Sequence, residues 1–163
     1  MEKGGIQMRF LLKISYDGSN YCGYQSQPNQ ETVQNCLEEA LTKYGDKIAV
    51  GIDCKDEYAY GRGWLSASKL HYIEFAKQLE QKGVKTIIVT DISKDGTLSG
   101  PNVEMLKKLK KEVRMDIVAS GGIKDIKDIE ALKAIHVYGA ITGKAMYHQT
   151  LSLEEAIALC KEE

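Results

Sequence analysis

The sequence predicts an α/β protein in which five strand-helix units form one parallel sheet. Short apolar runs alternate in strict order with segments whose apolar residues recur at helical spacing, and turn-forming residues separate them. Such alternation favours parallel strands, because right-handed crossovers through helices connect neighbouring parallel strands. The spacing leaves open whether the sheet lies open, as in flavodoxin, or curls as a fragment of a barrel.

The first unit is expected within residues 8–43. Met8–Tyr16 is rich in apolar residues and predicts a strand, which ends at the turn residues Asp17–Asn20. Thr32 stands where a helix N-cap would stand, ahead of apolar residues at helical spacing. This helix is expected to end near Lys43.

Four further units follow. The predicted strands cover residues 48–53, 86–90, 116–119 and 138–142. The predicted helices cover residues 66–81, the segment from Pro101 through Leu109, residues 126–134 and residues 151–161. We expect residues 1–8 to be a leader and residues 9–163 to form a single α/β domain, with parts at 9–43 and 44–163.

Composition and charge narrow the class of partner. The chain has 163 residues, of which 43% are hydrophobic, and a formal net charge of −1. Nothing in these values indicates nucleic acid or an anionic membrane as a partner. Residues 1–7 lack the apolar run of a signal peptide, and the four cysteines are scattered without a CxxC pair. We therefore expect a cytoplasmic protein with reduced cysteines, no bound metal and no cofactor.

Polar residues and glycines follow the predicted strands at their carboxyl ends, the edge where α/β folds bind ligands. They are Asp53, Thr90 with Asp91 and Asp95, Ser120-Gly121-Gly122, and Thr142-Gly143-Lys144. Two neighbouring glycine loops offer backbone N–H groups of the kind that hold a phosphate. One such loop alone is more often a tight turn, and a single aspartate is more often a cap. The phosphate hypothesis therefore depends on the pair of loops.

From Tyr44 onward the chain resembles the C-terminal half of the ProFAR isomerases, a family of histidine-biosynthesis enzymes. The matching segments are YGDKIAVGIDCKD, RGW at 62–64, VTDISKDGTLSGPN at 89–102, VASGGIKDI at 118–126 and ITGKAMY at 141–147. They are ordered and correctly spaced over about three-quarters of the chain. RGW and GKAMY favour the isomerases over their close relative, the cyclase subunit of imidazole glycerol phosphate synthase.

This resemblance implies a (βα)8 barrel enzyme that runs an Amadori rearrangement, in which a general acid opens a ribose ring and a paired carboxylate moves a proton. Asp53 matches the family's carboxylate on the fifth strand, Thr90 matches its partner on the sixth, and Asp95 lies in the matching KDGT loop. Trp64 matches an aromatic residue in a loop over the substrate. Gly122 and Gly143 match one of the family's two phosphate sites, and we expect Gly121 and Lys144 in the same loops to bind the phosphate with them.

The family's other carboxylate and second phosphate site belong to its first half-barrel, which the resemblance does not cover. Because the loss of one acid-base partner costs about 10²–10⁴-fold, we expect no efficient isomerase turnover. Glu57, His136 and Gln149 stand where the family commonly has glycine. A positive φ at such a position costs a non-glycine residue about 1 kcal/mol, so these loops are expected to be strained or to follow another path.

Residues 13–41, KISYDGSNYCGYQSQPNQETVQNCLEEAL, resemble the opening of a TruA-type tRNA pseudouridine synthase. YDG, the G-Y-Q-x-Q-P loop and T-V-Q before L-E-x-A-L match that family's first strand, loop and helix. Its nucleophilic aspartate lies in an R-T-D-x-G-V-type loop that has no counterpart in this chain. RNA modification is therefore not expected.

Together the two resemblances predict a chimera joined near Lys43-Tyr44, a recombinant scaffold without efficient catalysis that retains a site for phosphate or a phosphosugar. The alternatives are a weak isomerase and a tRNA-binding remnant. For the fold we favour a flavodoxin-like, doubly wound sheet, in which the first unit's helix covers a face carrying Ala49, Gly51, Thr90 and Ala119 or their neighbours. The alternative is a half-TIM-barrel sheet that pairs with a second copy as a homodimer.

Overall fold

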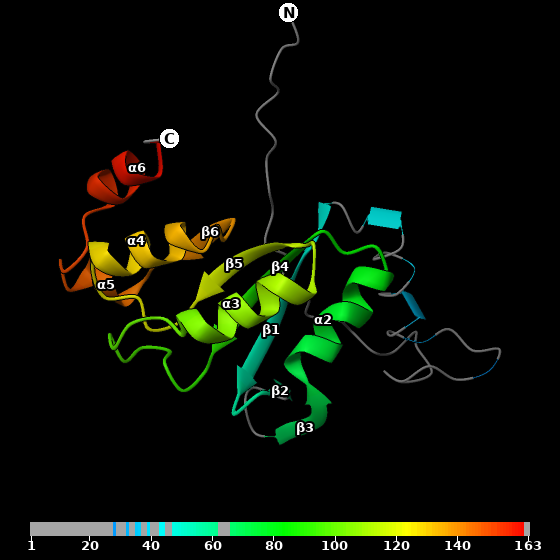
Figure 1. Cartoon of the computed structure of the whole chain (residues 1–163). Coiled ribbons are helices and arrows are strands. Elements are labelled where there is room, and N and C mark those ends of the chain that lie inside the picture. The colour runs from blue at the N-terminus through cyan, green and yellow to red at the C-terminus, as the bar shows by residue number, and fades with distance from the viewer. Residues whose placement is uncertain are drawn as a thin grey trace, which may run out of the picture.

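The computed structural model describes residues 47–61 and 66–161, together with residues 28, 32, 35, 36, 39, 43 and 44. Its strands form one six-stranded sheet with the order β3-β2-β1-β4-β5-β6 (Figure 1). They are β1 (Ala49–Lys55), β2 (Tyr58–Gly61), β3 (Ser66–His71), β4 (Thr86–Asp91), β5 (Asp116–Ser120) and β6 (Gly139–Ile141). The strands β1, β4, β5 and β6 are mutually parallel, whereas β2 and β3 form an antiparallel hairpin beside β1.

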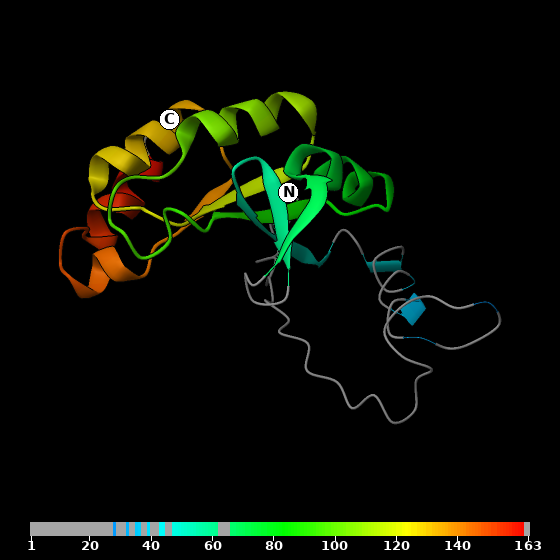
Figure 2. The same cartoon turned by 90° about the horizontal axis from the view of Figure 1, so that it is seen from below.

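Helices connect β3 to β4, β4 to β5 and β5 to β6, and two further helices follow β6. They are α2 (Tyr72–Gln81), α3 (Val103–Glu112), α4 (Ile126–Ala134), α5 (Lys144–Tyr147) and α6 (Leu153–Lys161). Figure 2 shows α2, α3 and α4 on the same side of the sheet. Within the described ranges, every helix is too short or too polar to span a lipid bilayer.

The hydrophobic core lies between these helices and one face of the sheet. Alternate strand residues point into it and are at most 1% exposed, namely Ile52, Cys54, Ile87, Val89, Ile117 and Ala119. The period of two follows from strand geometry, which sends successive side chains to opposite faces. Ala119 therefore lies on the helix-covered face. Of the residues expected on one face with Thr90, Ala119 itself is thus excluded, and its neighbour Ser120 takes that place.

The α/β class and the parallel sheet are confirmed, and the arrangement is consistent with half of a TIM barrel. The parallel strands lie across the sheet in chain order, β1-β4-β5-β6, as they do in a barrel. A doubly wound sheet requires the strand-helix unit expected within residues 8–43, and most of these residues lie outside the described ones. The expected leader also lies outside them, so both stay predictions. Thr32 is described, and its Oγ1 accepts a hydrogen bond from Asn35 N at 3.3 Å, which confirms the predicted cap.

The largest difference from the prediction lies between β1 and α2. Ser66–His71 forms strand β3, whereas the sequence pattern predicted a helix beginning at Ser66. The error came from Leu70 and Ile73, whose spacing of three continues the helical pattern of α2 across the strand boundary. The helix begins after His71, whose Nδ1 accepts a hydrogen bond from Ile73 N at 3.3 Å. Strand β2 and the short helix α5 were not predicted.

The three positions at which the family commonly has glycine do adopt a positive φ. The φ angles are 68° at Glu57, 55° at His136 and 56° at Gln149. This conformation costs a residue with a Cβ atom about 1 kcal/mol or more. The loops therefore keep the glycine-type path and retain the strain that the sequence predicted.

Candidate functional site

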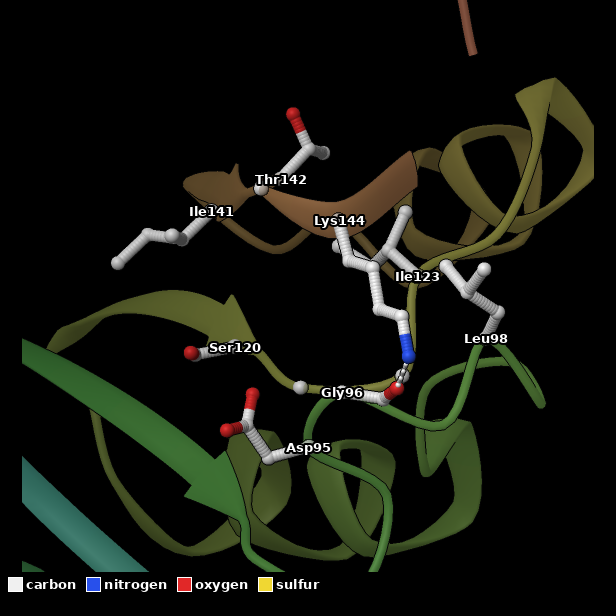
Figure 3. A pocket seen from close by; sticks show the side chains of 11 residues that line it. Asp95, Gly96, Leu98, Ser120, Ile123, Ile141, Thr142 and Lys144 are labelled. Atoms are coloured by element: carbon white, nitrogen blue, oxygen red, sulfur yellow. Dashed lines mark hydrogen bonds between the residues drawn. The ribbon is translucent and has the colours of Figure 1, made fainter. Parts of the chain in front are cut away.

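A pocket of about 290 Å³ lies at the carboxyl ends of β4, β5 and β6 (Figure 3). The loops after these three strands supply its walls. The lining residues predicted from the sequence are Asp95, Gly121, Gly122, Gly143 and Lys144. The remaining lining residues are Gly96, Leu98, Ser120, Ile123, Ile141 and Thr142. The two glycine loops that the sequence singled out thus line a single cavity.

Gly121 and Gly122 are required by the path of the loop after β5. Their φ angles are 94° and 84°, in the region that favours glycine. A Cβ atom on Gly122 would lie 2.3 Å from the carbonyl oxygen of Gly100, and Gly100 N donates a hydrogen bond to Gly122 O at 2.9 Å. Close contact between two loop backbones therefore shapes this wall of the pocket.

Gly143 has a different environment on the facing wall. Its φ is −126°, and a Cβ atom placed there would meet nothing within 4 Å. Steric fit therefore does not require glycine at this position. The absent side chain instead leaves the backbone at the start of α5 open toward the cavity.

Lys144 joins two of the loops that line the pocket. Its Nζ donates a hydrogen bond to the carbonyl oxygen of Gly96 at 2.6 Å (Figure 3). An ammonium group has three N–H donors, so this contact leaves donors for a ligand. Figure 3 shows the Asp95 carboxylate directed toward Ser120 instead. The pocket thus has a cationic group on one side and a carboxylate on the other.

Asp53 and Thr90 lie on the sheet beside this pocket. Asp53 is paired with Thr90 across β1 and β4, Thr90 with Ser120 across β4 and β5, and Ser120 with Ile141 across β5 and β6. Because directly paired residues share a face, these four residues form one row on the face opposite the core. Asp53 and Thr90 are half-buried. Ser120 lies next to Thr90 in this row and also lines the pocket. Trp64, the other residue predicted for the site, lies outside the described residues.

Asp91, which the sequence grouped with the strand-end residues, instead orders the loop after β4. Its side chain is 5% exposed, and its Oδ1 accepts hydrogen bonds from Ser93 N at 2.9 Å and from Ser93 Oγ at 2.6 Å. Its Oδ2 accepts from Asn102 Nδ2 at 2.7 Å, while Asn102 Oδ1 caps α3 through Met105 N. This carboxylate therefore stabilises the loop after β4, and it is not among the residues that line the pocket.

Burial isolates the Cys54 thiol from solvent. The Cys54 side chain is fully buried, and its Sγ lies 3.4 Å from both Thr90 O and Met105 Sδ. Burial, with smaller contributions from Asp91 and Asp53, raises the pKa of this thiol to about 12. Across the described residues, no three His, Cys, Asp or Glu side chains gather as metal ligands would.

The parallel strands in chain order and the pocket at their carboxyl ends define an α/β protein whose sheet is consistent with half of a TIM barrel. Comparison with known families makes the assignment specific. The chain belongs to the histidine biosynthesis protein family, whose model matches residues 26–152. This match begins ahead of the boundary that we expected near residue 44.

The chain is also similar to curated proteins named 1-(5-phosphoribosyl)-5-((5-phosphoribosylamino)methylideneamino)imidazole-4-carboxamide isomerase. It is 68% identical over 129 residues to the protein from Clostridium beijerinckii, a match that covers 79% of this chain and 54% of the relative. The identity is 62% over 128 residues for Clostridium botulinum, covering 78% and 54% respectively. It is 56% over 124 residues for Clostridium acetobutylicum, covering 76% and 52%.

The chain therefore spans about half the length of the curated relatives that it matches. The resemblance to a ProFAR isomerase half-barrel, first seen in the strand-end motifs, is confirmed. The sequence missed Gly96, Leu98 and Ile123 as lining residues. They enter the pocket because the loop after β4 folds against the loop after β5, a contact that no local pattern reveals.

Proposed function

We propose that this chain binds the phosphate group of a phosphosugar in the pocket between its two glycine loops. The observation that carries the proposal is the meeting of Gly121, Gly122, Gly143 and Lys144 around one cavity. Proteins bind phosphate with accessible backbone N–H groups and with cationic groups such as the lysine ammonium. The names of the relatives, which specify phosphoribosyl groups, favour a phosphoribosyl ligand for this chain.

We further propose that the bound ligand extends over the row that contains Asp53 and Thr90, and that the chain takes part in a phosphoribosyl isomerisation of histidine biosynthesis. In this proposal Asp53 is the proton-transfer group, and Thr90 lies beside it because the two residues are paired across β1 and β4 at the same edge of the sheet. Asp95 lines the pocket and is placed to contact a sugar hydroxyl. Trp64 is proposed as a contact above the substrate.

The efficiency of this reaction depends on a second acid-base group. An Amadori rearrangement moves protons at two positions, so Asp53 alone supports only slow turnover. This proposal has two versions: the chain is either a weak isomerase or a scaffold that binds phosphate without turnover. The two versions differ in the turnover they predict, and both place the phosphate in the same pocket. The isomerase version has the stronger support, since the relatives of this chain are named as isomerases.

A separate proposal concerns a chimeric origin of this chain, with a joint near Lys43-Tyr44. Residues 9–43 carry the pseudouridine-synthase-like motifs, and most of them lie outside the described residues. If this segment derives from an RNA-modifying enzyme and keeps its affinity, the chain will bind tRNA in a strongly salt-dependent way. A binding assay at low ionic strength tests this idea, and the absence of binding there would remove it.

The phosphate proposal is tested by titrating the isotope-labelled protein with ribose 5-phosphate in two-dimensional amide NMR. We expect the amide signals of Gly121, Gly122 and Gly143 to move while those of α2 stay fixed. Gly143→Asp should abolish the movement, because it places a negative charge in open space at the pocket wall. Gly143→Asn has nearly the same shape without the charge and should retain weakened binding. Equal affinity of the wild type and Gly143→Asp would refute the proposal.

A further inference from the structure

Among the described strands, the parallel part of the sheet has two open edges. On one side, β6 (Gly139–Ile141) is paired with β5 alone among the described strands. On the other side, β2 pairs with β1 only along Asp53–Lys55, so Ala49–Ile52 has no strand partner on that edge within the described residues. Unpaired N–H and C=O groups on a strand edge readily accept another strand.

The described helices α2, α3 and α4 all lie on the other face of the sheet in Figure 2, so they leave the face between these edges open. Gly51, Ile88, Val118 and Gly139 are paired in register and form a second row on this face, next to the row of Asp53. None of these four residues is buried, and Ile141 in the Asp53 row is 45% exposed. The face thus combines apolar side chains with two glycines that leave room for an approaching surface.

We propose that a second copy of this chain covers this face and closes an eight-stranded parallel barrel. Each copy supplies β1, β4, β5 and β6, and β6 of each copy pairs with the Ala49–Ile52 edge of the other. A two-fold axis along the barrel keeps all eight strands parallel and forms both new strand pairs at once, so no open edge of the parallel sheet remains.

Two observations favour a second copy over another occupant. Four parallel strands are half of the eight at which such sheets close. The two open edges belong to strands of the same direction, which permits parallel pairing between copies.

Closure would also complete the site, a consequence that rests on the proposed function. With all strands parallel, the carboxyl ends of both copies meet at one mouth. Asp53 of each copy then faces the same interior, and each copy brings its own pocket to the rim. The second copy therefore supplies the second acid-base carboxylate and a second phosphate pocket, which suits a ligand with two phosphates.

The test is the mass of the full chain in solution by light scattering after size-exclusion chromatography. We expect the wild type at about twice 18.1 kDa. Gly51→Glu should reduce the mass to that of the monomer, because a charge on the covered face has no partner. A Cβ atom at Gly51 meets nothing within 4 Å, so the monomer has room for the new side chain. Gln81→Glu adds the same charge on exposed α2 and should leave the dimer intact.

A monomeric wild type, or a dimer that persists unchanged in Gly51→Glu, would overturn the proposal. A wild-type monomer would indicate that the chain's own residues cover the face.

Amide hydrogen exchange of the wild type provides a measurement that needs no variant. Residues 49–52 and 139–141 should gain protection as concentration rises, and equal protection at all concentrations would contradict the pairing. Ribose 5-phosphate titration of the Gly51→Glu monomer separates the two proposals, since its pocket lies within one chain.

Discussion

Asp53 on β1 and Thr90 on β4 are directly paired across adjacent parallel strands, so both side chains leave the sheet on the face opposite the core. Ser120 continues the row on β5 and also lines the pocket. The proposed proton-transfer group and the proposed phosphate pocket therefore share one edge and one face of the sheet. Single substitutions can therefore alter the proton-transfer group and the phosphate pocket one at a time.

Asp53→Asn should lower isomerase turnover by about 10²–10⁴-fold, because an amide cannot accept and return a proton as a carboxylate does. Binding of ribose 5-phosphate should be unchanged, since Asp53 does not line the pocket. Steady-state kinetics and the NMR titration measure the two effects. Asp56→Asn is the matched control, because Asp56 is exposed in a turn with a φ of 51°, a conformation that asparagine tolerates. Equal loss in both variants would remove the role of Asp53.

The two glycine loops should respond differently to the same substitution. Gly122→Ala should lower the free energy of unfolding by about 2 kcal/mol or more, because φ is 84° and the new Cβ would clash with the carbonyl oxygen of Gly100. Gly143→Ala should change it by less than about 0.5 kcal/mol, since φ is negative at this position and a new Cβ atom would meet nothing within 4 Å. Urea unfolding curves of both variants provide the measurement. Similar costs would contradict the described loop paths.

Much of the fold could be predicted because the signals are local. The strand segments at 86–90 and 116–119 are apolar runs that the core must bury, and the caps at Asn102 and Asp125 immediately precede α3 and α4. The hairpin of β2 and β3 could not be predicted. Its sequence shows no clear alternation of polar and apolar residue types, and its stability depends on pairing with β1, which is a tertiary contact.

The residues of the site could be predicted from the sequence, but the contacts between its loops could not. Two glycine loops at consecutive strand ends indicated a shared pocket, which the structure brings together. The hydrogen bond from Lys144 to Gly96 joins residues 48 positions apart, and local spacing carries no information about it. Asp91 looked equivalent to Asp95 in the sequence, yet one is buried and the other exposed, because the turn between them reverses the chain.

Asp91→Ala should be strongly destabilising, by about 2–3 kcal/mol. The substitution removes the acceptor of three hydrogen bonds and leaves the donors of Ser93 and Asn102 without it. The free energy of unfolding in urea measures the loss. Asp95→Ala serves as the control, because Asp95 is exposed and should cost less than about 0.5 kcal/mol. A neutral Asp91→Ala would show that the loop after β4 does not depend on this carboxylate.

His136→Gly should stabilise the protein by about 0.5–1 kcal/mol. His136 has a φ of 55° in the turn that follows α4, and glycine adopts this conformation without the steric cost. Part of the gain is offset by the greater entropy of glycine in the unfolded chain. His148→Gly makes the same change where φ is −84° and should destabilise the protein. Thermal unfolding of both variants should therefore shift in opposite directions, and a common direction would contradict this explanation.

Cys54 should resist thiol reagents in the folded protein, whereas Cys160 should react. Burial raises the pKa of Cys54 to about 12, so at pH 8 only about one thiol in 10⁴ is ionised, and the thiolate is the reactive form. Cys160 is exposed on α6. Labelling with an alkylating reagent at pH 8, followed by peptide mass spectrometry, measures both rates. After unfolding in urea the two should label alike, which controls for local sequence. Equal rates in the folded protein would mean that the interface between α3 and the sheet opens readily.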